Sequence, residues 1–536
     1  MTRMTEPTNA VGSSMNPEPQ NIVLTDVQSR HAARLVQLLS NRTFALDLSA
    51  LGAGKTYTAS AVSLALGFDH VVVVCPVSVQ PKWEAMREQY GVKVTSTISF
   101  HALRSVKKKQ PKHGLLSRRD YKTWITARSG LREQIERVEF EPTDKYLAMT
   151  SRSRTLLVID EIQNFKNVTS QFGACRALLS PIVSGVGERG SRALLLSGSP
   201  IDKQSQAVTM FRAMGVMMHE ELTRYDVGRR RSEWLGMTEI RDFCMGLDPD
   251  ETRKIMVGVS ADDSAERLRG AVYRLFQEVF KPAFAAEMPP PATGTVVTKV
   301  NAFYHVHDEG DRAALTRAVA ALAAAVRYDS TTGTVSFVHS GTSADTLSAL
   351  TIALLKIETA KVSTFVRVAR AVLESSPSRK VVVCLNYTAN IDAVMAGLRS
   401  HAPLRLDGSI NASDRARVLR EFQAPDVRRR VLVGNVHVCS TGIDLDDKNG
   451  AFPRTALISP NYSTISLYQL GHRFQRLDTR SDARFEMVYG AHSRETNVLT
   501  ALARKSQVMK DTAAAQAAAG VVFPGDLEAW EEDHAP

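Results

Sequence analysis

Two series of short apolar runs, each run separated from the next by a segment of helical pattern, constrain the fold of this chain most strongly. The runs are rich in Val, Ile and Leu, which is typical of strands that helices cover on both faces. Such strands form parallel sheets, so the sequence predicts an α/β protein with two lobes. The runs are FALDL (44–48), HVVVVC (70–75), RTLLVID (154–160), RALLLS (192–197), KVVVCL (380–385), RVLVG (430–434), TALIS (455–459) and RFEMVYG (484–490).

The positions of these runs divide the chain into five predicted parts. The stretch between the two series has helical patterns such as AERLRGAVYRLFQEVF, and the proline cluster in KPAFAAEMPPPATGTVV predicts a loop or hinge. We expect a disordered leader over 1–21, a first lobe over 22–215, a mostly helical insertion over 216–345, a second lobe over 346–505 and a flexible acidic tail over 506–536.

Length and composition indicate a soluble, intracellular protein with no membrane partner. The chain has 536 residues, of which 44% are hydrophobic and 23% charged, enough for two or three domains with their own cores. No run of about 18 apolar residues predicts a membrane span. The N-terminus lacks the apolar core of a signal peptide. Five widely spaced cysteines without a CxxC pair suggest neither a zinc site nor a disulfide framework.

Positive charge is concentrated in one part of the chain. The formal net charge is +11, and residues 101–154 carry fourteen Lys or Arg against six Asp or Glu. This excess predicts a polyanionic partner such as nucleic acid. Basic surface loops that only aid solubility are the alternative that charge alone leaves open.

A glycine-rich loop, GAGKT, follows the first apolar run and precedes a helical pattern. In this strand–loop–helix context Gly52, Ala53 and Gly54 allow the backbone N–H groups to surround a phosphate at the helix N-terminus. Lys55 would then reach the β- and γ-phosphates, and the Thr56 hydroxyl would bind Mg²⁺. A tight strand-to-helix turn with a surface lysine is the alternative for this stretch alone.

A pair of carboxylates follows another buried run, about 105 residues after the loop. Asp160 and Glu161 end the run RTLLVID, and parallel sheets bind ligands at the carboxyl ends of their strands. We expect Asp160 to hold Mg²⁺ and Glu161 to orient or deprotonate the attacking water. Ser49 stands where the general phosphate-loop pattern has its first glycine.

With this loop and this carboxylate pair, the chain resembles superfamily 2 helicases and translocases, most closely the Snf-type branch and its poxvirus and giant-virus nucleoside triphosphatase relatives. GxGKT is the Snf-type form of motif I, which does not require a glycine at position 49. Gln28 occupies the place of the family's Q motif, which reads adenine. The other similar elements of the first lobe are CPVSVQPKW (75–83) for motif Ia, DEIQ (160–163) for motif II and SGSPI (197–201) for motif III.

The second series of runs resembles the second lobe of the same family. QLGHRFQR (469–476) is similar to motif VI, in which both arginines, here Arg473 and Arg476, enter the nucleotide cleft and stabilise the transferring γ-phosphate. His472 replaces the usual Asp or Gly of that motif. STGIDLDD resembles motif V, so Gly442 and Asp444 are candidate nucleotide-binding residues.

The resemblance implies two tandem RecA-like lobes that bind ATP and Mg²⁺ between them and move along nucleic acid. DNA is the favoured track and RNA the alternative, with a role in viral transcription or genome handling and a transcription complex as a partner. Two other functions stay open: an RNA helicase of the DEAD/DEAH kind, and a scaffold or transcription-factor subunit that has lost catalysis. The compartment would be the nucleus or cytoplasm, or the virion if the chain is viral.

Overall fold

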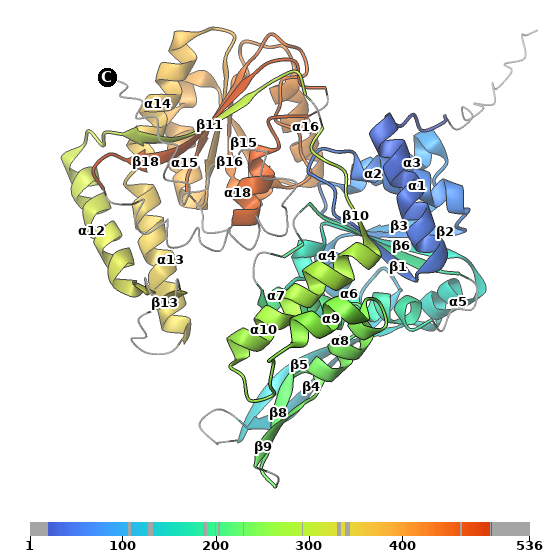
Figure 1. Ribbon diagram of the computed structural model, residues 1–536. Coiled ribbons are helices and arrows are strands. Elements are labelled where there is room, and N and C mark those ends of the chain that lie inside the picture. The colour runs from blue at the N-terminus through green and yellow to red at the C-terminus, as the bar shows by residue number, and fades with distance from the viewer. Residues whose placement is uncertain are drawn as a thin grey trace, which may run out of the picture.

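The computed structural model describes most of the chain (Figure 1). The predicted tail lies outside the described residues, as does the predicted leader up to residue 19. The described residues are 20–105, 109–126, 132–185, 190–198, 200–201, 204–228, 230–291, 293–329, 334–337, 343–460, 464–476, 478–493 and 495.

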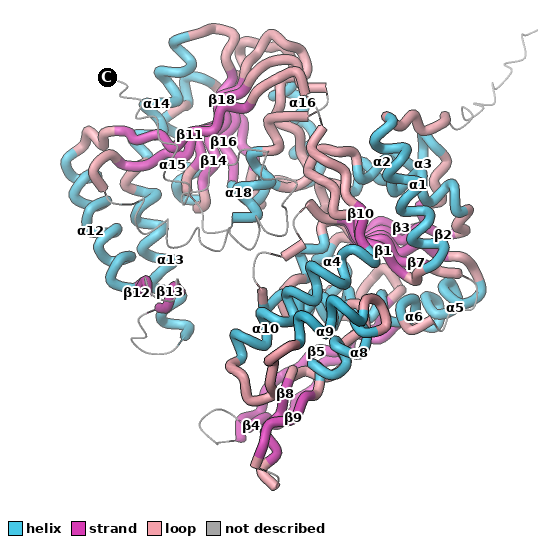
Figure 2. The backbone as a smooth tube through the Cα atoms, in the orientation of Figure 1, coloured by secondary structure: helices cyan, strands magenta, loops and turns pink. Residues whose placement is uncertain are grey.

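Two six-stranded parallel sheets, each between layers of helices, form the two lobes (Figure 2). This confirms the predicted α/β fold with two tandem RecA-like lobes. The first sheet has the order β10-β1-β7-β6-β2-β3. Its strands are β1 Phe44–Asp47, β2 His70–Val74, β3 Val94–Ile98, β6 Thr155–Asp160, β7 Arg192–Leu196 and β10 Ala285–Ala286.

The second sheet has the order β11-β18-β17-β14-β16-β15. All of its neighbouring strands are parallel, with Val382 of the central strand β14 beside Leu432 of β16 and Ala456 of β17. Its strands are β11 Val297–Tyr304, β14 Lys380–Leu385, β15 Leu404–Leu406, β16 Val431–Asn435, β17 Arg454–Ile458 and β18 Ala483–Gly490. Its helices are α14 Val362–Ser375, α15 Thr388–Gly397, α16 Ala412–Gln423, α17 Val436–Ser440 and α18 Thr464–Gly471.

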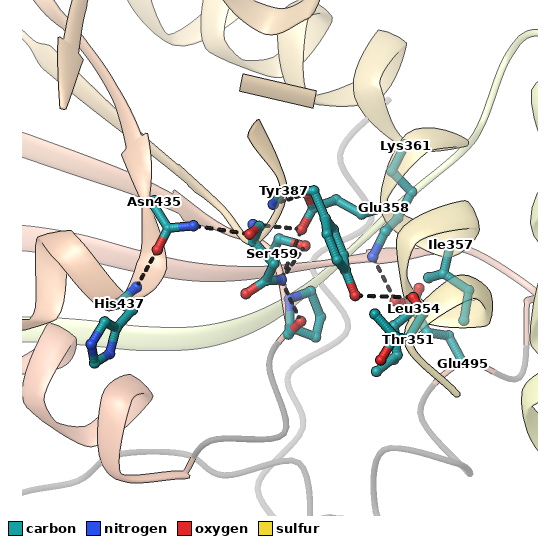
Figure 3. A pocket seen from close by; sticks show the side chains of 12 residues that line it. Thr351, Leu354, Ile357, Glu358, Lys361, Tyr387, Asn435, His437, Ser459 and Glu495 are labelled. Carbon is teal, nitrogen blue, oxygen red and sulfur yellow. Dashed lines mark hydrogen bonds and ion pairs between the residues drawn. The ribbon is translucent and has the colours of Figure 1, made fainter. Parts of the chain in front are cut away.

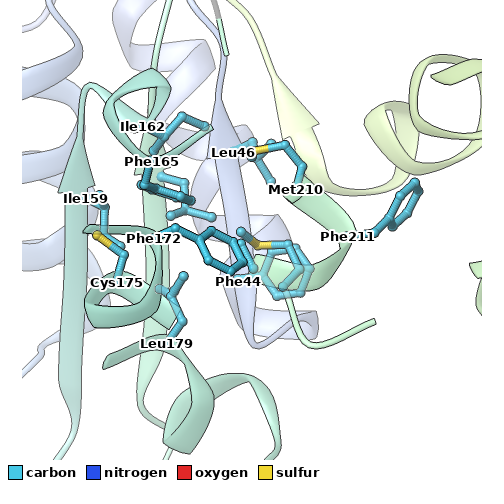
Figure 4. Close-up of a cluster of buried hydrophobic side chains, with 14 of the residues drawn as sticks. Phe44, Leu46, Ile159, Ile162, Phe165, Phe172, Cys175, Leu179, Met210 and Phe211 are labelled. Carbon is cyan, nitrogen blue, oxygen red and sulfur yellow. The ribbon is translucent and has the colours of Figure 1, made fainter. Parts of the chain in front are cut away.

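Every residue of β1 and β6 is buried, because helices cover both faces of the first sheet. Figure 4 shows part of the core on one face, where Phe44 of β1 and Phe172 of α6 lie among aliphatic side chains. The helices of this lobe are α1 Asp26–Asn41, α2 Lys55–Leu66, α3 Gln80–Tyr90, α4 Phe100–Arg104, α5 Asp144–Arg152, the 3₁₀ turn Ile162–Phe165, α6 Ser170–Val183 and α7 Ser205–Ala213.

The segment expected as a helical insertion is divided between the two lobes. Phe284 stacks on Phe44 with ring centroids 4.5 Å apart, so its N-terminal helices share the core of the first lobe. Strand β10 extends the first sheet and β11 the second, and the predicted boundary at 346 falls within α13. The helices of this segment are α8 Gly236–Met245, α9 Pro249–Met256, α10 Ala265–Arg274, the π-helical turn Leu275–Phe280, α11 Lys281–Phe284, α12 Glu309–Ala325 and α13 Ser343–Thr359.

Three antiparallel hairpins complete the described structure. They are β4 Leu116–Thr126 with β5 Arg132–Pro142, β8 Thr223–Asp226 with β9 Arg231–Trp234, and β12 Val326–Asp329 with β13 Thr334–Phe337. The first two extend away from the first sheet in the same direction (Figure 1). Across the described ranges, no helix has the length and apolar character that crossing a membrane requires. All five cysteines are buried and free.

Candidate active site between the lobes

The GAGKT loop connects β1 to α2 and depends on glycine at two positions. Gly52 and Gly54 have φ of +82° and +93°, in the left-handed region that side chains disfavour. A Cβ at Gly54 would also lie 2.3 Å from Nε2 of Gln28, which donates a hydrogen bond to the Ala53 carbonyl at 2.9 Å. Gln28 completes the N-terminal capping box of α1 with Thr25. Gln28 therefore positions this loop.

Lys55 is the first residue of α2, and its side chain folds back over the loop. Its Nζ donates to the carbonyls of Ser49 at 2.9 Å and Ala50 at 3.1 Å. Burial lowers the pKa of Lys55, while the nearby carboxylates Asp47, Glu161 and Asp160 act in the opposite direction. The ammonium group thus stands between the loop and the carboxylates. Thr56 follows in the first turn of α2 and is half-buried.

The predicted carboxylate pair lies at the carboxyl end of β6. Asp160 accepts a hydrogen bond from Nε1 of Trp83 at 3.3 Å, and burial together with Glu161 raises the pKa of Asp160 to about 7. Glu161 has φ of +68°, a conformation that costs a non-glycine residue about 1–3 kcal/mol. Strain of this kind at the end of a central strand is typical of functional residues.

Glu161 is held by glutamines from both lobes. Its Oε2 accepts from Nε2 of Gln163 at 2.6 Å and from Nε2 of Gln469, on α18 of the second lobe, at 3.2 Å. Ser197, after β7, donates to Oε1 of Gln163 at 2.8 Å. The carboxylate is therefore oriented by a chain of hydrogen bonds that crosses the cleft.

The two arginines after α18 reach the first lobe. Arg473 is buried, and its Nη2 lies 4.0 Å from Oε1 of Glu161 with no hydrogen-bond partner among the described residues. Burial and the neighbouring Arg476 lower the pKa of Arg473 to about 10. Nη1 of Arg476 lies 3.1 Å from where a Cβ of Gly52 would be. Arg476 thus stands at the phosphate loop and Arg473 beside Glu161, and an Nη2 without a hydrogen bond is suited to an anionic ligand.

The predicted motif V residues contact the first lobe from the other side of the cleft. Gly442 has φ of +65°, and a Cβ there would lie 2.4 Å from Oγ of Ser78. Asp444 lies 3.8 Å from Nζ of Lys82 and 3.3 Å from Nε of Arg476. Burial alone would raise the pKa of Asp444, but Lys82, Arg476 and a lysine on its own loop hold it well below its usual range. Asp444 is thus an ionised bridge between the lobes.

His472 is buried beside the arginines without joining their contacts. Its Nε2 has no hydrogen-bond partner within the part of the chain that the structure describes, and its ring meets that of Tyr468 edge-on. Burial lowers the pKa of His472 well below its usual range, and the surrounding cations Lys299, Arg476, Arg473 and Lys55 lower it further. The ring is neutral and adds no charge to the cleft.

The structure brings together the predicted catalytic residues Lys55, Asp160, Glu161, Arg473 and Arg476. Two further residues contact this group: the Ser49 carbonyl accepts from Lys55, and Gln163 donates to Glu161. Lys82 approaches it through Asp444, a contact between distant segments that no local sequence pattern indicates. The predicted motif III residue Ser199 lies outside the described residues.

The residues present fit a magnesium nucleotide. The two glycines give the loop the positive φ of a phosphate-binding turn, and the buried Nη2 of Arg473 has no hydrogen-bond partner among the described residues. Among the described residues no three His, Cys, Asp or Glu side chains gather to hold a metal alone. Mg²⁺ bound to nucleotides typically takes one or two protein ligands and completes its shell with phosphate and water. Thr56 and Asp160 are the residues that would hold it.

A separate cavity of about 190 Å³ lies at the carboxyl edge of the second sheet (Figure 3). Glu358 of α13 is buried there, and its carboxylate accepts from the backbone N–H groups of Asn386 at 2.8 Å and Tyr387 at 3.1 Å. The side chains of Asn386 and Asn390 donate to it as well. The loop after β14 is therefore closed around the protein's own carboxylate.

Known proteins are similar to parts of this chain, although no family model matches it. It is 35% identical over 80 residues to the putative ATP-dependent RNA helicase L364 of Acanthamoeba polyphaga mimivirus, which is 15% of each protein. It is 26% identical over 160 residues to the DNA repair protein RAD5 of Candida albicans, which is 29% of this chain and 14% of RAD5. The matched parts thus span about 15% of these relatives' lengths.

Two solved structures of the Sulfolobus solfataricus SWI2/SNF2 ATPase core, one of them in complex with dsDNA, match along nearly the whole chain. Each is 14% identical with a TM-score of 0.29, and coverage is 93% or 94% on either side. That score is too low to support the fold, which rests on the two parallel sheets. The similarity to known proteins is therefore carried by the two partial matches, to a putative ATP-dependent RNA helicase and to a DNA repair protein.

Proposed function

We propose that this chain is an ATP-driven nucleic-acid motor, which hydrolyses ATP to ADP and phosphate between its lobes and moves along DNA. One observation carries the proposal. Arg473 and Arg476 of the second lobe meet Lys55 and Glu161 of the first at a glycine loop suited to phosphate. A site divided in this way couples hydrolysis to the closing of the lobes.

The residues of the first lobe bind the nucleotide and activate water. The loop N–H groups and Lys55 hold the phosphates, and Glu161 orients the attacking water and accepts its proton. Mg²⁺ on Thr56 and Asp160 would neutralise charge on the β- and γ-phosphates. Arg473 and Arg476 stabilise the charge that spreads over the γ-phosphoryl oxygens, and the closed cleft excludes competing water.

Duplex DNA is the favoured track. The net charge of +11 and the exposed Lys109 and Lys112 after α4 suit contacts to a phosphate backbone that do not read sequence. RAD5 is named as a DNA repair protein, whereas L364 is named as a putative RNA helicase. RNA is therefore the second candidate track. A viral role in transcription or genome handling, with a transcription complex as partner, is consistent with the mimivirus relative.

A decayed, non-catalytic scaffold is disfavoured by the side chains that remain. Loss of catalysis in such a fold would remove the lysine, the glutamate or an arginine of the cleft. Here Lys55, Glu161, Arg473 and Arg476 are all present, and they converge on one place.

Steady-state ATPase activity with a panel of nucleic acids tests the proposal. We expect the strongest stimulation with duplex DNA, less with single-stranded DNA or RNA, and weaker stimulation at higher salt because phosphate contacts release counterions. Stronger stimulation by RNA would establish the second track. Absence of hydrolysis with every nucleic acid would contradict the motor.

A further inference from the structure

A strap, formed by residues 285–291 and 293–296, leaves the first sheet and reaches the second lobe. It begins as β10, which pairs in parallel with β1 and places Ala285 beside Leu46. The N–H of Leu48 then donates to the Ala286 carbonyl at 2.9 Å. The strap therefore runs beside the backbone that leads into the phosphate loop.

Ser49 fastens the strap to the first lobe. Its Oγ accepts a hydrogen bond from the N–H of Met288 at 2.9 Å, and the N–H of Ala50 donates to the Met288 carbonyl at 3.0 Å. Ser49 is fully buried, and its Oγ also lies 3.2 Å from Nε2 of His31. A glycine here would remove the side-chain hydrogen bond of this anchor.

Gln475 fastens the strap to the second lobe at the arginine loop. Its Nε2 donates to Oγ1 of Thr293 at 2.5 Å and to the carbonyl of Thr295 at 2.6 Å. Val296 adds backbone contacts, since its N–H donates to Oδ1 of Asp482 at 2.7 Å. Gln475 lies between Arg473 and Arg476 in sequence, so this anchor acts on the loop that carries both arginines.

Prolines stiffen the strap between its two anchors. Pro289, Pro290 and Pro291 each have a ring that fixes φ, which restricts the backbone to extended conformations. Cγ of Pro291 lies 3.8 Å from where a Cβ of Gly52 would be, next to the position of Arg476. A stiff segment thus passes the phosphate loop where the arginine meets it.

We propose that Ser49 and Gln475 are positioning residues, which act through the strap to set how the arginines meet the phosphate loop. The inference rests on the proposed function and adds to it a device that aligns the two halves of the site. Neither residue has to touch the nucleotide. Misplacement of a catalytic group by about 1 Å can cost on the order of 100-fold in rate.

Two variants, one at each anchor, test the strap. Ser49→Gly restores the general glycine pattern and removes the hydroxyl; Gln475→Glu keeps the shape of the side chain but removes its donor. We expect each to lower kcat for ATP about 10-fold or more, with ADP affinity changed by no more than about 2-fold. Ser49→Thr keeps the hydroxyl and should retain more activity than Ser49→Gly. Gln37→Glu, on the exposed face of α1, is the matched control.

The loss of kcat in a double variant tells whether the two anchors act through one strap or whether each substitution disturbs the structure independently. If both anchors act through one strap, the Ser49→Gly/Gln475→Glu double variant should lose no more kcat than the worse single variant. Multiplying losses, or wild-type kcat in Gln475→Glu with an unchanged melting temperature, would overturn the strap. Inactivity of the wild-type chain with every nucleic acid would instead overturn the proposed function, so the two failures are distinguishable.

Discussion

The loops that leave β1 and β14 differ in what their backbone N–H groups face. After β1, Gly52 and Gly54 turn the chain so that it is open to an anionic ligand. After β14, the N–H groups of Asn386 and Tyr387 are already bonded to the buried carboxylate of Glu358. Both loops leave the carboxyl end of a parallel strand, yet Lys55 and Arg476 lie beside the first, whereas a carboxylate of the same lobe fills the second.

This difference shows how the two lobes divide the residues of one site between them. The second lobe satisfies its own loop internally and contributes cations to the site of the first. Arg473 is held by its Nε on the Ser440 carbonyl at 2.8 Å, while its Nη2 has no hydrogen-bond partner within the described residues.

Removing the buried arginine should have the largest effect. We expect Arg473→Ala to lower kcat about 1,000-fold, because an arginine at the γ-phosphate stabilises charge that forms only in the transition state. ADP affinity should change little, since the first lobe holds ADP. Stopped-flow hydrolysis and ADP titration measure the two quantities. Arg399→Ala, at an exposed arginine of the same lobe, is the control; equal losses in both would contradict the assignment.

A side chain at the contact between the lobes should have the next largest effect. Gly442→Ala places a Cβ 2.4 Å from Oγ of Ser78, so we expect incomplete closure and a kcat about 10- to 100-fold lower. Gly450→Ala is matched to it, because Gly450 also has positive φ but the described atoms within 4 Å of a Cβ there belong to Arg480 of its own lobe. Both should lose about 1–2 kcal/mol of stability. Similar kcat values in the two variants would show that the contact does not matter.

Opening the closed loop of the second lobe should affect stability. Glu358→Gln replaces one acceptor oxygen by a donor that faces buried N–H groups, so we expect the free energy of unfolding to fall by about 2–3 kcal/mol. Denaturant titration measures it, with the exposed Glu374→Gln on α14 as control. A variant as stable as the wild type would mean that the carboxylate is not what holds this loop.

The smallest predicted effect is a pH dependence from His472. The pKa of His472 is lowered in the folded chain, so the unfolded chain binds a proton more readily. The free energy of unfolding therefore decreases as the pH falls through about 6.5, the ordinary pKa of histidine. Between pH 7.5 and 5.5, His472→Gln should lose about 1 kcal/mol less unfolding free energy than the wild type. His307→Gln, at an exposed histidine, should follow the wild type. Parallel pH curves for all three proteins would contradict a neutral, buried ring.

Much of the fold could be predicted because buried parallel strands leave continuous apolar runs. Each of the eight runs forms a strand of one of the two sheets. Strand β10 could not be predicted, since Ala285–Ala286 is too short to show a pattern. The β4–β5 hairpin is polar on much of both faces, so its strands lack the apolar alternation that marks a half-buried sheet.

The candidate site was predictable where one short motif carries the chemistry and not where distant segments meet. GAGKT and Asp160–Glu161 can be recognised because glycines and acids follow buried runs. The contacts of Ser49 with Met288 and of Gln469 with Glu161 join residues far apart in sequence, so no local pattern indicates them. Ser49 shows this limit best, because the residue that departs from the general motif is the one that anchors the strap.

The most direct test of a reaction completed across the cleft is single-turnover ATP hydrolysis by Glu161→Gln with duplex DNA. The variant keeps the size of the side chain but removes the carboxylate that we propose as the base. We predict ATP binding close to that of the wild type and hydrolysis slower by at least about 100-fold, while the exposed Glu88→Gln behaves as wild type. Hydrolysis by Glu161→Gln at the wild-type rate would contradict the account.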